Sequence, residues 1–272
     1  MESGTLQIGR IRESLRTRRV GRRIEYFVST TSTNDEAWRR IHEPDADGLV
    51  VLAEHQSAGR GRMGRAWESP RGASLLCSVA VVDGARELSG GDLSMLTAVA
   101  ACDAIRVCAG VHATIKWPND LLVDGRKVAG ILIESRARQD GVPAYVIGIG
   151  VNCLQQRGHL SEGWGDAATS LELESDGVID RTGLAMALLA ELDRWLARPR
   201  AWTTDRLRTA WLALAEPMGQ RVVLRSRGKL YAGSMIDIDP AAALVVQLDE
   251  GGIRAFAAAD TTWMKRESLT AR

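Results

Sequence analysis

The chain has 272 residues, of which 45% are hydrophobic and 25% charged, an ordinary composition for a folded protein with one sizeable core and a small second domain. Its 35 lysines and arginines against 34 aspartates and glutamates leave a net charge of +1, which excludes a surface built throughout for nucleic acid but not a local basic site. The four cysteines show neither CxxC pairing nor a histidine at zinc-like spacing, so we expect buried thiols in a reducing compartment.

The N-terminal segment, residues 1–23, is a basic arm with seven arginines and no lysine. Its charges stand where a secretory signal needs an apolar stretch, and no run of about 18 apolar residues follows, so we predict a cytoplasmic protein without a membrane span. Leu6, Ile8, Ile11 and Leu15 fit one short helix, which is too little for a helix-turn-helix module. We therefore expect a solvated arm, with a weak anionic contact as the alternative.

Regular secondary-structure patterns begin at Ile24. Strands are expected at residues 24–29, 48–55, 74–82, 113–117, 121–135 and 145–153, and helices at 33–43, 93–110, 183–198 and 204–215. Thr33 and Glu36 fit a capping box, with Thr33 at the N-cap of the first helix. Asp124-Gly125 lies between two apolar runs and predicts a two-residue hairpin turn.

After Pro217 the pattern changes to short alternating strands, which is typical of a small all-β barrel. These strands are expected at residues 220–226, 229–239, 242–249 and 252–259. The predicted class is therefore α+β: a mixed sheet with flanking helices over 24–216, then a compact β domain over 217–272.

The loop from Gly59 to Arg65, GRGRMGR, combines three glycines with three arginines. The glycines allow a ligand to approach the backbone, and the arginines offer forked donors to phosphate or carboxylate. The loop contains GxGxxG, but no helix pattern follows and no Gly-Lys-Ser/Thr closes it, so it is neither a dinucleotide fingerprint nor a Walker A loop. We interpret it as an anion-binding loop, with an exposed turn or a nucleic-acid contact as alternatives.

The segment from Lys116 to Asp120, KWPND, places a lysine and an aspartate around a proline turn. The hairpin at Asp124-Gly125 folds Lys127 back towards this turn, so two cations and one carboxylate would share a small volume. Charges gathered among apolar strands are costly without a purpose, which favours a functional cluster. A structural ion pair is the alternative.

Two shorter motifs stand at a helix start and inside a strand. Ser32-Thr33-Asn34 is suited to capping a helix or to binding a polar ligand group, and the two uses are compatible. Gly148 and Gly150 interrupt an apolar strand, which indicates either a ligand close to the backbone or a β-bulge.

Taken in order, STN, GRGRMGR, KWPND, KVAGIL and GIGVN resemble the biotin–protein ligase family over roughly Ile24 to Asn152, and the remaining chain is similar in layout only. The resemblance implies a class II synthetase-like ligase domain followed by an SH3-like barrel. It implies that biotin and MgATP form biotinyl-5′-AMP and that biotin then passes to a lysine of a carrier. The expected carrier is the biotin carboxyl carrier domain of an acetyl-CoA or other acyl-CoA carboxylase, or of pyruvate carboxylase, and the enzyme would be a monomer or homodimer.

The resemblance also implies a role for each motif residue. Around biotin it places Ser32, Thr33, Asn34, Gln56, Arg60, Gly61, Arg62, Lys127, Gly130, Leu132, Gly148 and Gly150. Around ATP and the adenylate it places Arg60, Arg62, Arg65, Trp67, Lys116, Asn119, Lys127 and Asn152. Catalysis would rest on Lys127, Asp120, Arg62 and Lys116, with magnesium carried in by ATP. In this scheme Asp120 orients or deprotonates the incoming lysine, and Trp67 and Asn152 meet the adenine.

The chain departs from the family pattern at two places. Met63 stands where the family often has arginine, and we expect activity to survive because three loop arginines remain. The N-terminal arm is shorter than the winged helix of ligases that also repress biotin operons, so we predict no specific DNA binding. The alternatives are a lipoate or octanoate ligase, a DNA-binding biotin sensor and an inactive binding module. The STN motif with Gln56 favours biotin, and the presence of both Lys127 and Asp120 argues against an inactive module.

Overall fold

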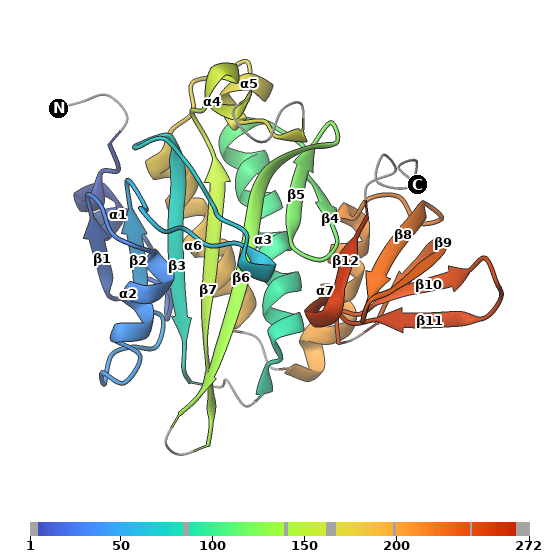
Figure 1. The fold of residues 1–272 in the computed structure, drawn as a ribbon. Helices are drawn as coiled ribbons and strands as arrows, with labels where there is room; N and C mark the ends of the chain where they lie inside the picture. The colour runs from blue at the N-terminus through green and yellow to red at the C-terminus, as the bar shows by residue number, and fades with distance from the viewer. Residues whose placement is uncertain are drawn as a thin grey trace.

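The computed structural model describes residues 5–83, 87–138, 141–161, 167–197, 200–239 and 241–264. Residues 1–4 of the expected arm and 265–272 of the expected C-terminal domain lie outside these ranges. A seven-stranded mixed sheet runs in the order β1-β2-β3-β7-β6-β5-β4 (Figure 1). Its strands are β1 (Ile24–Phe27), β2 (Val50–Ala53), β3 (Ser74–Val81), β4 (Thr114–Lys116), β5 (Asp120–Val123), β6 (Arg126–Ala137) and β7 (Pro143–Asn152).

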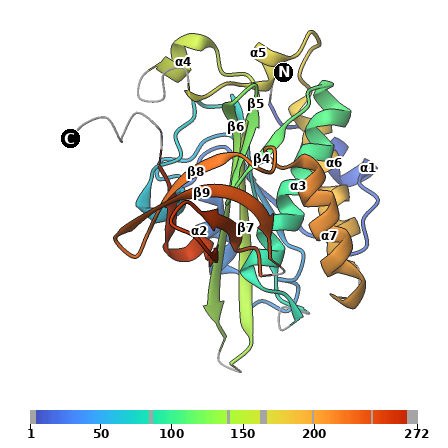
Figure 2. The same cartoon turned by 90° about the vertical axis from the view of Figure 1, so that its right-hand side faces the viewer.

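Helices cover the two faces of this sheet unequally. The helices are α1 (Ile8–Ser14), α2 (Thr33–Arg39), α3 (Gly90–Ala109), α4 (Arg157–Ser161), α5 (Leu171–Glu174), α6 (Arg181–Leu196) and α7 (Arg200–Leu214). The long helices α3, α6 and α7 lie on one side of the sheet, while α2 packs on β2, β3 and β7 from the other side (Figure 2). None of the helices in the described ranges is long and apolar enough to cross a membrane.

Strand alternation explains why one face is filled and the other is open. In β7, the side chains of Ile147 and Ile149 belong to the core under α3 and α6. Gly148 and Gly150 occupy the alternate positions, which belong to the opposite face of the sheet. The sheet is continuous here, because β6 and β7 pair without a register shift along their shared length. The glycines therefore do not mark a bulge; they leave a bare patch on the face that α2 only partly covers.

Two local predictions have opposite outcomes. The hairpin turn is confirmed, because Asp124 and Gly125 take φ values of 48° and 74° between β5 and β6. The capping box at Thr33 is wrong: Ser32 occupies the N-cap without a side-chain bond, and Glu36 instead accepts a hydrogen bond from Thr30 Oγ1 at 2.7 Å. The side chain of Thr33 is used elsewhere, in the pocket described below.

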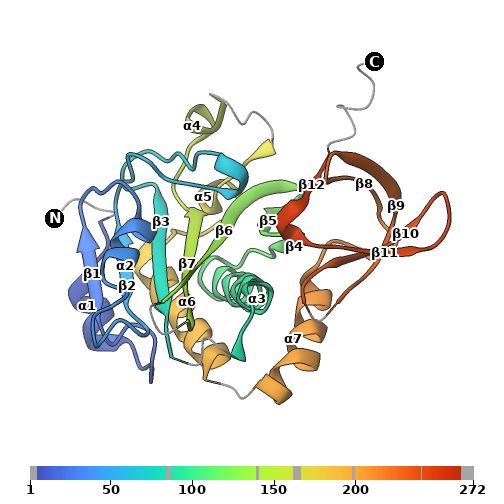
Figure 3. The same ribbon diagram turned by 60° about the horizontal axis from the view of Figure 1, so that its bottom comes forward.

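A second sheet follows helix α7. It comprises β8 (Arg221–Ser226), β9 (Lys229–Ile238), β10 (Leu244–Leu248), β11 (Ile253–Phe256) and β12 (Thr261–Trp263), in the antiparallel order β11-β10-β9-β8-β12. The α+β class is confirmed, but in residues 217–239 and 241–264 no pairing of β11 with β12 closes the expected barrel. The short strand β12 was not predicted, and it lies beside β4 and β5, on the side facing the large sheet (Figure 3).

The N-terminal segment packs against the domain, so the prediction of a solvated arm is wrong. Ile11 in α1 and Val20 are fully buried in the main core. Asp193 of α6 accepts hydrogen bonds from the backbone N–H groups of Arg18, Arg19 and Val20 at 2.9, 2.8 and 2.9 Å. One carboxylate therefore fixes three consecutive peptide groups, which the arginine-rich composition did not indicate.

A buried ion pair stabilises the same region. Arg181 Nη2 lies 2.7 Å from Glu54 Oε2, and the two side chains are only 2% and 6% exposed. Glu54 Oε1 also accepts the Leu6 N–H at 2.8 Å, and Arg181 Nη1 donates to Ser74 O at 2.8 Å. The pair thereby joins the N-terminal segment, β3 and α6.

Glu54→Gln should lower the free energy of unfolding by about 3–5 kcal/mol, because it leaves a buried guanidinium beside a neutral amide. Urea denaturation measures the loss. Asp249→Asn, which breaks an exposed pair with Arg221, is the matched control and should cost little. An equal effect of the two substitutions would show that the buried pair has no special structural role.

Candidate functional site

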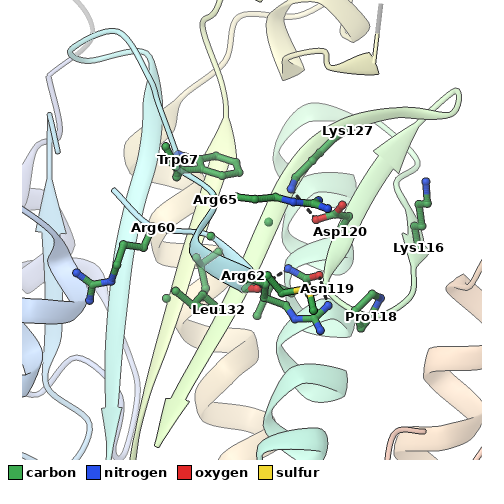
Figure 4. A pocket seen from close by; sticks show the side chains of 18 of the residues that line it. Arg60, Arg62, Arg65, Trp67, Lys116, Pro118, Asn119, Asp120, Lys127 and Leu132 are labelled. Atoms are coloured by element: carbon green, nitrogen blue, oxygen red, sulfur yellow. Dashed lines mark hydrogen bonds and ion pairs between the residues drawn. The ribbon is translucent and has the colours of Figure 1, made fainter. Parts of the chain in front are cut away.

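A pocket of about 560 Å³ opens on the bare face of the large sheet (Figure 4). The loop Gly59–Arg65 and strand β12 form the sides of this pocket. The motif residues that line it are Ser32, Thr33, Asn34, Gln56, Arg60, Gly61, Arg62, Arg65, Trp67, Lys116, Asn119, Asp120, Lys127, Gly130, Leu132, Gly148 and Gly150. Motifs far apart in the chain therefore meet in one cavity.

One end of the pocket is polar and uncharged. Thr33 Oγ1 and the Thr33 backbone N–H both donate to Gln56 Oε1, at 3.0 and 2.7 Å. Ser78 Oγ from β3 donates to Asn34 Oδ1 at 2.6 Å and lies 2.7 Å from Thr33 Oγ1. Ser32, Thr33 and Asn34 are all buried, and among the described residues nothing pairs with the Asn34 Nδ2 group. A buried donor without a partner is costly, so this end is suited to a ligand that accepts a hydrogen bond.

The floor of the pocket is made of glycine. Gly130 pairs with Gly150, and Leu132 pairs with Gly148, on adjacent strands. A Cβ atom added to Gly148 would lie 2.5 Å from Asn34 Oδ1, and one added to Gly150 would lie 2.5 Å from the Trp67 ring. Close approach to the backbone is therefore the reason that glycine occupies these positions.

The other end of the pocket is charged. The hairpin brings Lys127 Nζ to 2.6 Å from Asp120 Oδ1, as the sequence predicted. Arg62 Nη1 donates to Asn119 Oδ1 at 3.2 Å, so the arginine loop meets the KWPND turn. Lys116 lies opposite Asp120 in the β4–β5 pairing and lines the same pocket. Its Nζ lies 5.4 Å from the centre of the Trp263 ring, and the side chain points away from the Lys127–Asp120 pair (Figure 4).

Positive charge is in excess at this end. At this end the described lining residues include four cations, Arg62, Arg65, Lys116 and Lys127, and one carboxylate, Asp120. Burial lowers the pKa of the Arg62 guanidinium, although Asp120 opposes this and Arg65 reinforces it. Arginine nevertheless stays protonated in proteins, so the arrangement favours an anionic ligand.

The loop itself has a defined conformation. Its base is closed by hydrogen bonds from Gly61 N to Arg65 O at 2.7 Å and from Trp67 N to Gly59 O at 2.9 Å. Met63, at its tip, is a non-glycine residue with a φ of 56°. The Trp67 ring lies on the glycine floor, where its Nε1 is buried with no partner in the described ranges, and 5.5 Å separates Lys127 Nζ from the ring centre.

One predicted residue lies outside this pocket, and its predicted contact with the adenine stays a prediction. Asn152 does not line the pocket: its Nδ2 donates to Thr169 O at 3.0 Å and its Oδ1 accepts from Gln155 at 3.0 Å. Ser78 was missed, although a serine inside the apolar run of β3 was a usable signal. Thr262 and Trp263 of β12 were also missed, and no pattern in the sequence brings the second sheet to the pocket.

Comparison with known proteins agrees with this geometry. Residues 25–152 match the model of the "Biotin/lipoate A/B protein ligase family". The biotin--[acetyl-CoA-carboxylase] ligase of Paracoccus denitrificans is 35% identical over 226 residues, 81% of this chain and 92% of that protein. The bifunctional ligase/repressor BirA of Bacillus spizizenii is 32% identical over 251 residues, 91% of this chain and 76% of that protein.

A solved structure of biotin protein ligase from Aquifex aeolicus, in complex with biotin and ATP, aligns with a TM-score of 0.77. At 21% identity, over 90% of this chain and 99% of that one, this likeness shows the fold alone. The sequence relatives carry the assignment further: these proteins are ligases, and the chain belongs to the biotin protein ligase family.

Gly150→Ala should displace the Trp67 ring from the floor, because the added methyl group and the ring cannot occupy the same space. The loop lies at the surface, so the ring can swing outwards and the fold should survive. We expect a red shift in tryptophan emission that is lost in the Gly150→Ala/Trp67→Phe double variant. Gly9→Ala, whose methyl group meets nothing within 4 Å, is the control. An unchanged Trp67 environment would contradict the close approach.

Proposed function

We propose that the protein activates biotin with MgATP to biotinyl-5′-AMP and transfers biotin to a lysine of a biotin carboxyl carrier domain. One observation carries the proposal: a neutral polar end and a cationic end share one pocket, on either side of a glycine floor. Biotin has the matching polarity, because a cyclic urea lies at one end of the molecule and a carboxylate at the other.

The polar end suits the cyclic urea. This group needs donors for its carbonyl oxygen and acceptors for its two N–H groups. Asn34 Nδ2 is a buried donor that no described residue engages, and Ser32 and Gln56 add further polar atoms at the same end. The floor at Gly148 would lie against the fused rings and their acyl chain, which a side chain there would block.

The cationic end suits the first chemical step. An oxygen of the biotin carboxylate attacks the α-phosphorus, and the bond from this phosphorus to the bridging oxygen breaks to release pyrophosphate. Carboxylate and triphosphate repel each other, so cations must neutralise both before they meet. Lys127 and Arg62, which meet Asp120 and Asn119 at this end, would serve this task, and Lys116 would become available if its side chain left Trp263.

The second step needs a neutral lysine amine. This amine attacks the acyl carbon of the mixed anhydride, the bond to the phosphate oxygen breaks, and AMP leaves while the amine loses a proton. Asp120 is the carboxylate that would take or direct this proton. It is paired with Lys127 at 2.6 Å, so the move of Lys127 onto the anionic ligand would free Asp120 for the amine.

Magnesium would enter the site bound to the phosphates of ATP. In the described ranges no group of three or more His, Cys, Asp or Glu side chains gathers that would hold a metal ion by itself. Magnesium prefers few protein carboxylates plus substrate phosphates, and Asp120 is the acidic residue that the described part of the pocket offers.

We propose a ligase domain over residues 24–216, an SH3-like domain over 217–272, and a cytoplasmic location. The carrier would belong to an acyl-CoA or pyruvate carboxylase, with the enzyme a monomer or homodimer. We also predict no specific DNA binding, which an electrophoretic mobility assay on a biotin-operon operator tests.

The proposal is tested by incubating the protein with MgATP, biotin and a biotin carboxyl carrier domain, and weighing the carrier by mass spectrometry. A parallel tube contains lipoate in place of biotin. We expect the mass gain of one biotin on the carrier lysine and none from lipoate. Transfer of lipoate alone would contradict the urea-binding role of the polar end, and binding of biotin without transfer would indicate a sensor.

Lys127→Ala should lower biotin-dependent pyrophosphate release by about 100-fold or more, because a cation that stabilises the developing charge is lost. The fold should survive, since the lysine is partly exposed. Unchanged circular dichroism and an unchanged urea midpoint check this point. Lys229→Ala, at an exposed lysine of β9, is the matched control. Near-normal pyrophosphate release in Lys127→Ala would remove this residue from the mechanism.

A further inference from the structure

Arg60 is a loop arginine that does not serve the cationic end of the pocket. Its guanidinium turns the other way (Figure 4). It donates to both carboxylate oxygens of Asp35 in α2, at 2.7 and 2.9 Å. It also donates to Glu134 Oε1 in β6 at 3.2 Å. Two carboxylates from two different elements therefore hold one side chain of the loop.

This pair of carboxylates is itself fixed in place. Trp38 Nε1 donates to Glu134 Oε2 at 2.8 Å, and the Arg136 guanidinium lies 4.4 Å from the centre of the Trp38 ring. Asp35 directly follows Ser32-Thr33-Asn34, so its backbone is anchored with the polar end of the pocket. Hydrogen bonding to Arg60 holds the pKa of the Asp35 carboxyl below its usual value, although burial opposes this.

The loop is held on the opposite wall as well. Arg62 donates to Asn119 Oδ1 at 3.2 Å and to the backbone oxygen of Ala258, which lies in the short helix η4 (Ala258–Asp260) before β12. Thr262 Oγ1 of β12 lies 3.1 Å from Met63 Sδ. The loop is thus attached to α2 and β6 through Arg60, and to the KWPND turn and the second sheet through Arg62 and Met63.

We propose that Asp35 and Glu134 are positioning residues that hold the arginine loop closed across the pocket through Arg60, and thereby limit the escape of a bound intermediate. The attachment of the loop is argued from the contacts of Arg60, Arg62 and Met63 and does not depend on the reaction. Only its consequence for biotinyl-5′-AMP rests on the proposed function. A reactive acyl phosphate is hydrolysed by water, so a loop that stays across the pocket gives the carrier time to arrive.

The expected effect of losing these contacts is moderate. The side chains of Arg60, Asp35 and Glu134 are 37%, 30% and 24% exposed, so solvent screens part of their attraction. The bidentate geometry of the Arg60–Asp35 pair and the second carboxylate, Glu134, strengthen the attachment. Loss of Asp35 or Glu134 should therefore change the exposure of the loop without unfolding the domain.

Limited trypsin digestion tests the attachment, because the loop carries arginines at which trypsin cleaves. In Asp35→Asn and Glu134→Gln, we expect cleavage after Arg62 and Arg65 to become about three- to tenfold faster, with no change at other sites. The control, Asp249→Asn, should leave loop cleavage unchanged. Unchanged cleavage in both variants would overturn the proposal, and so would faster cleavage throughout the chain, which indicates general destabilisation.

A double-variant comparison tests whether Asp35 acts through Arg60. If it does, adding Asp35→Asn to Arg60→Gln should change loop cleavage no further, because the shared contact has already been lost. Additive effects would show that Asp35 acts by another route.

The consequence for the intermediate is measured on the full-length enzyme loaded with biotin and MgATP. Free biotinyl-5′-AMP is followed by mass spectrometry after rapid filtration, and we expect Asp35→Asn and Glu134→Gln to release it about three- to tenfold faster. Equal release rates would overturn the claim on escape. If the unmodified protein forms no adenylate while loop cleavage still responds to the variants, the proposed function fails and the attachment stands.

Discussion

The absence of side chains at Gly130, Gly148 and Gly150 is the constraint on which the site depends. Three glycines on two paired strands leave a bare patch on one face of the sheet. The opposite face, which the long helices cover, is filled by apolar side chains. Into this patch come Asn34 from one helix and Trp67 from the segment just after the arginine loop, each close to a glycine backbone. Without the patch, the polar and cationic ends of the pocket would have no common floor and would be two unrelated clusters.

Charge is distributed so that the two ends have different tasks. The polar end is neutral and nearly satisfied internally, with one buried amide donor left over. Among the described lining residues, the cationic end has more positive charge than its single carboxylate balances, and that carboxylate, Asp120, pairs with Lys127 at 2.6 Å. Arg60 belongs to neither end, because its guanidinium pairs with the Asp35 carboxylate of α2. Three loop arginines of one motif therefore have three different environments.

The sequence was informative where function restricts residue type over a short stretch, as in the hairpin at Asp124-Gly125 and the order of the motifs. It failed where tertiary contacts decide. Three peptide N–H groups find Asp193, 173 to 175 positions away, so a basic arm becomes part of the core. The direction of Arg60 depends on carboxylates from α2 and β6, and the contribution of β12 depends on how the second sheet docks. Local patterns do not encode these choices.

In the proposed complex, biotin lies against the floor at Gly148 in a fixed direction. A crystal structure of the protein with biotin and a non-hydrolysable ATP analogue tests it most directly. We expect the cyclic urea beside Asn34 and Gln56, and the carboxylate within hydrogen-bonding distance of Lys127, next to the α-phosphate. Biotin bound in the reverse direction, or nucleotide bound away from Lys127 and Arg62, would contradict it.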